Sequence, residues 1–161
     1  MRDYKQYKST VYSIIGCAME VHRVLKHGLL EAVYEECLSL ELQAHKISNK
    51  RQQEILIYYK ERLLDKKYKM DIVVDDIIIE LKSKSKITAA HRAQLCNYLR
   101  LTQKPIGILV NFGSTTLQGE RWAYDKDTND CFLLDKNMQP LPTHDVLMTE
   151  DDIYDEEKIN E

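Results

Sequence analysis

The sequence predicts a mixed α/β fold in which three antiparallel strands, a crossover helix and a further strand form one sheet flanked by helices. Two segments with apolar residues at helical spacing open the chain, and three segments rich in Ile, Val and Leu follow them. Another helical segment then separates these strands from a fully apolar one. The resulting order, α-α-β-β-β-α-β, is typical of a mixed sheet with helices packed on it.

The first two segments each place their apolar residues on one helical face. This spacing predicts a helix over 8–26, and the His27-Gly28 pair after it favours a helix end, because Gly is common just past a C-terminus. A second helix fits 29–45. The candidate core positions of the two helices are Val11, Ile14, Ile15, Ala18, Val21, Leu25, Leu30, Val33, Cys37, Leu38 and Leu42.

The middle and end of the chain supply the predicted sheet and its crossover helix. Alternating Ile, Leu, Val and Tyr predict the first three strands, and an Ala- and Leu-rich stretch over 87–102, with Thr88 as candidate N-cap, predicts the helix. The apolar run IGILVNF is typical of a strand buried on both faces. The predicted strands are 51–60, 64–74, 77–82, 106–112, 120–124 and 131–134, with a turn near Glu61-Arg62.

Charge is distributed unevenly along the 161 residues. The net charge is -3, but residues 145–161 hold eight acidic residues and one basic one, which leaves residues 1–144 with a net charge of +4. We therefore expect a single domain over 1–144, mildly basic and compatible with nucleic-acid binding, followed by an acidic, flexible tail over 145–161. A sharper alternative is that the tail occupies a basic groove of the domain in place of nucleic acid.

Segments for membrane insertion or export are not evident. There is no run of about 18 apolar residues and no apolar core near the N-terminus, so we expect a cytoplasmic protein without a membrane partner. The four cysteines form no C-x-x-C pair, which argues against a zinc or iron–sulfur site, and buried free thiols are expected. The chain also lacks a Gly-rich phosphate loop and a recognisable cysteine-nucleophile motif.

The stretch DIVVDDIIIELKSK, residues 71–84, joins apolar strands to charged ends. If Asp75-Asp76 form a two-residue turn, Val74 pairs with Ile77 and Asp71 lies directly across from Glu80. Adjacent carboxylates repel each other, and a hard divalent ion such as Mg²⁺ would offset the repulsion, with Lys82 beside it to hold a phosphate or a water. The plain alternative is that both carboxylates lie in water at the rim of the sheet.

Two helical segments add polar residues to this picture. Glu31 and Tyr34 lie one turn apart on the predicted second helix, and Gln94 and Tyr98 share a face of the crossover helix. His91 lies one turn before Gln94. A polar pair on an otherwise apolar helix indicates a polar site beneath it, although each signal alone is weak and a helical Tyr is more often a core residue.

In the order G-x-x-E, D, E-x-K and Q-x-x-x-Y, these residues resemble the RecB-like branch of the PD-(D/E)XK nuclease superfamily. Over residues 8–125 the segments GLLEAVYEE, DIVVDDIIIELK, HRAQLCNYL and GILVNFGS look more narrowly like small bacterial GxxExxxY proteins, with the Glu-to-Tyr spacing one residue shorter. The resemblance implies a restriction-endonuclease-like core. It also implies that Asp71, Glu80 and Glu31 hold the metal, Lys82 positions water or stabilises the phosphate, and Gln94 and Tyr98 support Lys82 or contact the nucleic-acid backbone.

The leading hypothesis is therefore a nuclease that uses Mg²⁺ or Mn²⁺ to hydrolyse phosphodiester bonds of nucleic acid, with DNA the expected substrate. Lys82, Lys84, Lys86 and Arg92 could follow the phosphate backbone. One alternative is a nuclease-like fold that binds nucleic acid or protein without cutting, and another is a metal-dependent hydrolase of other phosphate esters. Because a small domain offers little surface to grip a duplex, a protein partner or a homodimer could supply more.

Overall fold

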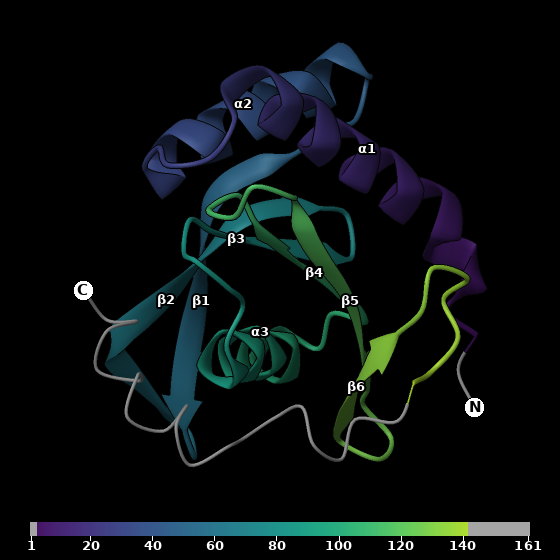
Figure 1. The fold of residues 1–161 in the computed structure, drawn as a ribbon. Coiled ribbons are helices and arrows are strands. Elements are labelled where there is room, and N and C mark those ends of the chain that lie inside the picture. The colour runs from purple at the N-terminus through teal and green to yellow at the C-terminus, as the bar shows by residue number, and fades with distance from the viewer. Residues whose placement is uncertain (1–2, 142–161) are drawn as a thin grey trace.

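The computed structural model describes residues 3–141, which form one six-stranded sheet with helices on both faces (Figure 1). Strand order follows chain order from β1 to β6, and every neighbouring pair is antiparallel except β3 and β4. The elements are η1 (Lys5–Tyr7), α1 (Lys8–Leu25), α2 (Glu31–Ala44), β1 (Lys50–Tyr59), β2 (Arg62–Val74), β3 (Ile77–Lys82), α3 (Ala89–Thr102), β4 (Ile106–Asn111), β5 (Gln118–Asp125) and β6 (Asp130–Leu134).

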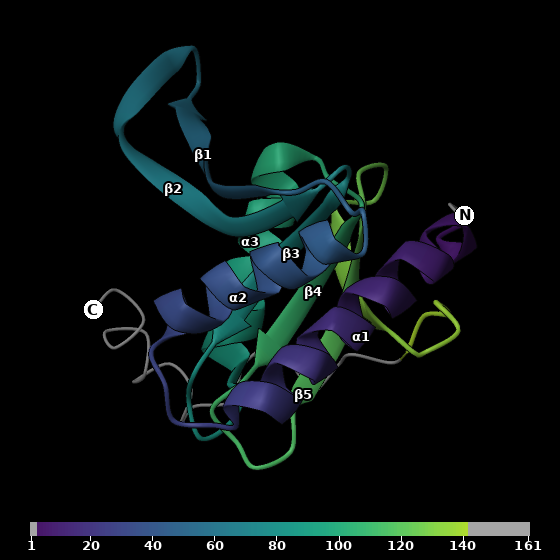
Figure 2. The same ribbon diagram turned by 90° about the horizontal axis from the view of Figure 1, so that it is seen from above.

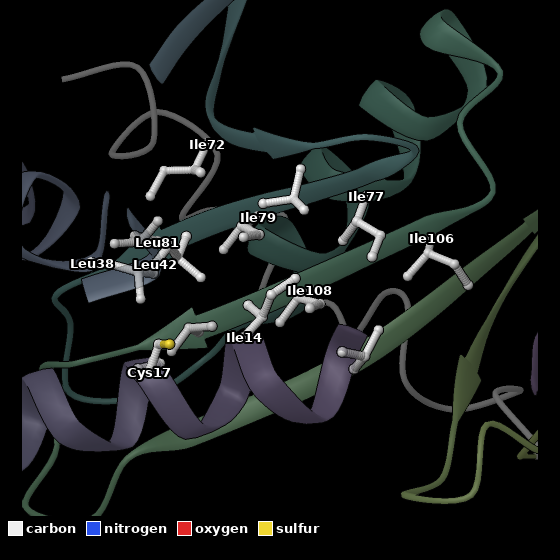
Figure 3. Packing of buried hydrophobic residues seen from close by; sticks show 14 of the residues in the cluster. Ile14, Cys17, Leu38, Leu42, Ile72, Ile77, Ile79, Leu81, Ile106 and Ile108 are labelled. Carbon is white, nitrogen blue, oxygen red and sulfur yellow. The ribbon is translucent and has the colours of Figure 1, made fainter. Parts of the chain in front are cut away.

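The sheet separates two hydrophobic cores. Helices α1 and α2 cover one face and α3 covers the other (Figure 1). Every residue of β3 and β4 is buried, as expected for parallel strands covered on both faces. In Figure 3, Ile14 of α1 lies beside Ile108 of β4 within the core on the α1/α2 side. The core on the α3 side includes Leu95, Leu99 and Trp122.

The predicted mixed fold is confirmed, including the crossover helix between two parallel strands. Predicted and observed helices agree within about two residues, and the two weaker C-terminal strands are present as β5 and β6. Thr88 does cap α3, because its side chain accepts a hydrogen bond from the His91 amide. No helix among residues 3–141 is long and apolar enough to cross a bilayer. The acidic tail lies outside the described residues.

A long β-hairpin extends from the body of the domain (Figure 2). The first eight residues of β2 are all exposed, and β1 is buried only at Ile55. On the opposite strand, β2, Met70 is buried at about the same level as Ile55. Both side chains pack in the core beneath α3 and so anchor the hairpin there. We refer to residues 56–69, beyond this anchor, as the arm. Although rich in Ile, Leu and Tyr, the arm contributes little to either core.

The expectation of four free thiols is wrong for one pair. Cys96 of α3 and Cys131 of β6 form a disulfide with Cα atoms 5.9 Å apart, whereas Cys17 and Cys37 are free. The two bonded cysteines lie 35 residues apart in sequence. Only the packing of α3 on the far end of the sheet brings them together, so no local spacing could have indicated the bond.

Replacing Cys131 with Ser should destabilise the oxidised protein by up to about 3–4 kcal/mol, because the closed loop restricts the unfolded chain. Chemical denaturation without reductant would measure this loss, and Cys37→Ser, at a half-buried free thiol, provides the control with a much smaller effect. In reductant, the difference between Cys131→Ser and wild type should shrink to the cost of burying a hydroxyl in place of a thiol. Four reactive thiols in denatured but unreduced wild type would show that the bond does not form.

Candidate active site

The hairpin between β2 and β3 has the register that the sequence predicts. Val74 pairs with Ile77, Val73 with Ile78 and Ile72 with Ile79 around a turn at 75–76. The regular ladder stops before Asp71 and Glu80. There, the Asp71 amide donates to Glu80 Oε1 at 3.0 Å, and the Leu81 amide donates to Asp71 Oδ2 at 2.9 Å. Each carboxylate therefore accepts a backbone N–H of the opposite strand.

Burial makes this pair of carboxylates electrostatically unfavourable. Glu80 is 3% exposed, and burial followed by the Asp71 charge raises its pKa well above the ordinary value. Burial also raises the pKa of Asp71, while the backbone hydrogen bond from Leu81 partly offsets this. Within residues 3–141, neither carboxylate takes part in an ion pair. Ionisation of both groups at neutral pH thus calls for a cation beside them.

The side-chain alternation of β2 breaks at Asp71. Met70 and Val73 both pack in the α3-side core, whereas Ile72 packs in the α1/α2-side core. Across the ladder, Gln52 has a left-handed backbone with φ of 53° and is skipped by the strand pairing. This irregularity brings Gln52 and Asp71 to one pocket of about 420 Å³. The pocket is lined by Glu31, Ala32, Glu35, Gln52, Asp71 and Leu81.

Glu35, which the sequence analysis did not single out, is the helical carboxylate in closest contact with this strand irregularity. It is 6% exposed and accepts hydrogen bonds from Gln52 Nε2 and from Arg51 Nε, the latter at 3.0 Å. The same Gln52 amide reaches Asp71 Oδ1 at 3.4 Å. Glu31 lies one turn earlier on α2 and lines the same pocket, but it is only partly buried. Its i, i+4 relation to Glu35 is the sequence signal that could have indicated the second carboxylate.

We expect Glu35→Gln to weaken divalent-metal affinity and cleavage by about 10–100-fold, because groups that orient a ligand matter nearly as much as the ligand. Glu31→Gln, on the same helix and pocket, is the matched control and should change either quantity less than about threefold. Calorimetric Mn²⁺ titration and initial cleavage rates would measure both effects. A larger loss for Glu31→Gln than for Glu35→Gln would restore Glu31 as the principal helical carboxylate.

Tyr34, the other polar residue noted on this helix, is part of the core. Its side chain is fully buried, and its ring stacks on Phe112 with centroids 4.6 Å apart. Its hydroxyl donates to the Lys26 carbonyl at 2.6 Å and accepts from the Leu29 amide at 3.2 Å. Tyr34 thus fixes the loop that leads into α2, which in turn positions Glu31 and Glu35.

On the α3 side, Gln94 contacts Tyr98, as their i, i+4 spacing predicts, and also contacts Lys82, as the family resemblance implies. Lys82 Nζ donates to Gln94 Oε1 at 2.8 Å, and Gln94 Nε2 donates to the Tyr98 hydroxyl at 3.2 Å. Lys82 is 8% exposed and has no carboxylate within ion-pair distance among the described residues. Burial and the charges of Glu80 and Asp71 raise the pKa of Tyr98, so this hydroxyl stays neutral at physiological pH.

Two other predicted residues serve the fold. His91 closes the capping box of α3, since its Nδ1 accepts a hydrogen bond from the Thr88 amide at 3.1 Å. Arg92 makes a bidentate contact with Glu120 at 2.8–3.1 Å, so it is not placed to follow a phosphate backbone as predicted. By contrast, Lys84 and Lys86 are exposed.

The loop after β3 is fixed by a residue that the sequence analysis missed. Asn111 is fully buried, and its side chain accepts from the Lys84 amide at 3.0 Å and donates to the Lys84 carbonyl at 2.9 Å. A Cβ at Gly113 would lie 2.1 Å from that carbonyl, so only Gly permits the close approach. Both contacts hold the chain in place just beyond Lys82.

The donor set suits a hard divalent cation, although the predicted three-carboxylate cluster is not assembled. Among residues 3–141, no group of three or more His, Cys, Asp or Glu side chains is arranged to hold a metal, so Glu31 does not join Asp71 and Glu80 in a ready-made site. Mg²⁺ is usually held by one or two carboxylates, with water and substrate phosphate completing its coordination. The pair of half-buried Asp71 and buried Glu80, which lack an ion-pair partner among the described residues, fits that requirement.

Comparison with known proteins agrees with this geometry. The family model of the PD-(D/E)XK nuclease superfamily matches residues 8–122. A solved structure, described as "Crystal structure of SSO0001", is similar to this chain with a TM-score of 0.50 and 16% sequence identity. The similarity covers 97% of this chain and 70% of that one, and at this identity it supports the fold alone. No curated protein matches the sequence significantly.

Proposed function

Because this chain belongs to the PD-(D/E)XK nuclease superfamily, we propose that it is a metal-dependent nuclease that hydrolyses phosphodiester bonds of nucleic acid, with DNA the expected substrate. The observation that supports this most strongly is the pair formed by half-buried Asp71 and buried Glu80, whose charges no ion pair of the described residues neutralises. Two adjacent ionised carboxylates are electrostatically unfavourable without a cation, whereas a metal-dependent nuclease would use them to hold one.

Asp71 and Glu80 would hold Mg²⁺ or Mn²⁺, with Glu35 and Gln52 orienting Asp71 from the side of α2. When bound, the ion supplies Lewis-acid activation of water and of the phosphoryl group. A cation at this position also converts a site that repels phosphate into one that attracts it.

Lys82 would stabilise charge on the phosphate or position the attacking water. An ammonium has three donor N–H groups, and Gln94 accepts from only one of them. Tyr98 in turn fixes Gln94, so the ammonium is held in place before substrate binds. Preorganised donors of this kind stabilise a transition state without reorganising during the reaction.

A second candidate is a nuclease-like fold that binds nucleic acid without cutting it. The observation in its favour is that residues 3–141 contain no preassembled group of three metal-binding side chains. A binding module should nevertheless tolerate loss of Lys82 and Glu80 without losing affinity for nucleic acid, whereas a nuclease should lose its activity.

The test follows linear and circular DNA, and RNA of the same sequence, in Mg²⁺, in Mn²⁺ and in EDTA. Wild type is compared with Lys82→Met and with Lys126→Met, which replaces an exposed lysine in the turn between β5 and β6 and serves as control. We expect metal-dependent cleavage by wild type and Lys126→Met alone, and cutting of the circle would indicate endonuclease action. Binding without cleavage by all three proteins would favour the binding module instead.

A further inference from the structure

The arm, residues 56–69, exposes an unusual number of large side chains for a solvated hairpin. Tyr58 and Tyr59 near its tip are 59% and 65% exposed. The exposed large hydrophobic residues of the arm are Leu56, Tyr58, Tyr59, Leu63, Leu64 and Tyr68. Figure 2 shows β1 and β2 extending beyond α2 at this end of the sheet, and Figure 1 shows them passing beside α3. Since these side chains stabilise neither core, they are available to a partner.

Basic residues are interleaved with these side chains. Residues 50–70 contain seven Lys or Arg and three Asp or Glu. Lys60 lies over the ring of Tyr59 at 5.5 Å, and Lys66 lies over the ring of Tyr68 at 5.9 Å. Within the arm, the described ion pairs include only Lys67 with Glu54, at 3.5 Å and well exposed. Exposed rings next to cations, with a positive excess, suit a partner that is both anionic and aromatic.

The arm leads directly to the candidate active site. The ring of Tyr68 lies 5.5 Å from that of Tyr98, which accepts a hydrogen bond from Gln94, the acceptor for Lys82. The same two strands carry Gln52 and Asp71 at the base of the hairpin. A fully exposed stretch of eight residues on β2 extends about 25 Å, which is long enough to contact several nucleotides.

We propose that the arm binds a single-stranded segment of nucleic acid and guides it to Lys82. The second part, guidance to Lys82, rests on the proposed nuclease function. The positive excess selects a polyanion. The exposed tyrosines select unpaired bases, because stacking requires a base face that a duplex hides. A second copy of the chain is a poorer partner, since its arm carries the same positive excess.

The test measures anisotropy of a labelled 30-nucleotide single strand and of the matching duplex, in EDTA so that nothing is cut. A Tyr58→Ala/Tyr59→Ala variant should bind the single strand about 10–100-fold more weakly, but the duplex less than about threefold more weakly. A Lys66→Ala/Lys67→Ala/Lys69→Ala variant should reduce the slope of log affinity against log salt by about 2. Circular dichroism and melting curves should be unchanged, because all five side chains are exposed.

Matched controls come from other exposed residues. Tyr12→Ala on α1, where the side chain is 77% exposed, and Lys126→Ala/Lys136→Ala should both bind like wild type. Unchanged single-strand binding by both arm variants would overturn the inference, as would a concentration-dependent dimer that these variants abolish. Binding is measured without metal, so the two proposals can fail separately. If wild type cleaves nothing but the arm variants still weaken single-strand binding, the nuclease function is contradicted and the arm assignment stands.

Discussion

Glu80→Gln is expected to stabilise the metal-free protein while it abolishes metal-dependent cleavage. The amide oxygen of Gln can still accept the hydrogen bond from the Asp71 amide that Glu80 Oε1 accepts at 3.0 Å. The substitution removes a charge that burial and the Asp71 carboxylate disfavour. We expect a gain of about 0.5–2 kcal/mol in unfolding free energy, within the usual range for relieving a destabilised functional site.

The raised pKa of Glu80 determines how the stability of the metal-free protein should change with pH. A carboxyl whose pKa is raised in the folded state contributes full stability below its unfolded pKa, near 4.5, and loses it as pH rises through the folded value. Metal-free wild type should therefore lose stability above about pH 4.5, and the advantage of Glu80→Gln should grow with pH. Thermal melting in EDTA across that range would measure the difference.

Glu120→Gln is the matched control, because that carboxylate is paired with Arg92 at 2.8 Å. It should destabilise the protein, in contrast to Glu80→Gln. If Glu80→Gln also destabilised the metal-free protein at neutral pH, the Glu80 carboxylate would be a structural requirement of the hairpin and not a group reserved for a cation.

Lys82→Met is expected to reduce the cleavage rate about 10²–10³-fold while metal binding is retained, since one preorganised donor to the reacting phosphate typically contributes this much. Met has a similar length and is compatible with a site that is 8% exposed. The Lys82 charge lowers the pKa of both Asp71 and Glu80, so its removal should raise both values and shift the pH profile of metal binding upward.

Single-turnover cleavage and Mn²⁺ titration on the same variant separate the two effects. Lys126→Met, with an exposed side chain in the turn between β5 and β6, should match wild type in both measurements. A Lys82→Met protein that lost metal affinity as strongly as rate, even at a pH where both carboxylates are ionised, would show that Lys82 acts through the metal site and not on the phosphate. A variant with the wild-type rate would remove Lys82 from the mechanism.

Local sequence rules predicted a large part of the site. The hairpin register follows from strand alternation around Asp75-Asp76, and the Gln94–Tyr98 contact follows from i, i+4 spacing on α3. These features depend on neighbouring residues within one element or one turn. The buried strand over 106–112 could also be predicted, because a continuous apolar run indicates a buried strand whichever strands pair with it.

The missed features depend on contacts between distant segments. Glu35 and Gln52 meet Asp71 because β2 changes phase at that residue and Gln52 adopts a left-handed backbone, neither of which has a sequence signal here. The bond between Cys96 and Cys131 depends on how α3 packs against β6. The exposure of the arm could not be predicted either, because its Ile, Leu and Tyr content resembles that of a buried strand.

The most direct test is a calorimetric titration of the protein with Mg²⁺ and Mn²⁺, performed on wild type, Glu80→Gln and Asp71→Asn in buffers of different ionisation enthalpy. We expect wild type to bind the ion and to release protons as it does so, because metal ligation ionises carboxyls whose pKa values are raised in the free protein. Both variants should lose most of the affinity and the proton release. Undiminished binding by Glu80→Gln would show that Asp71 and Glu80 do not form the metal site.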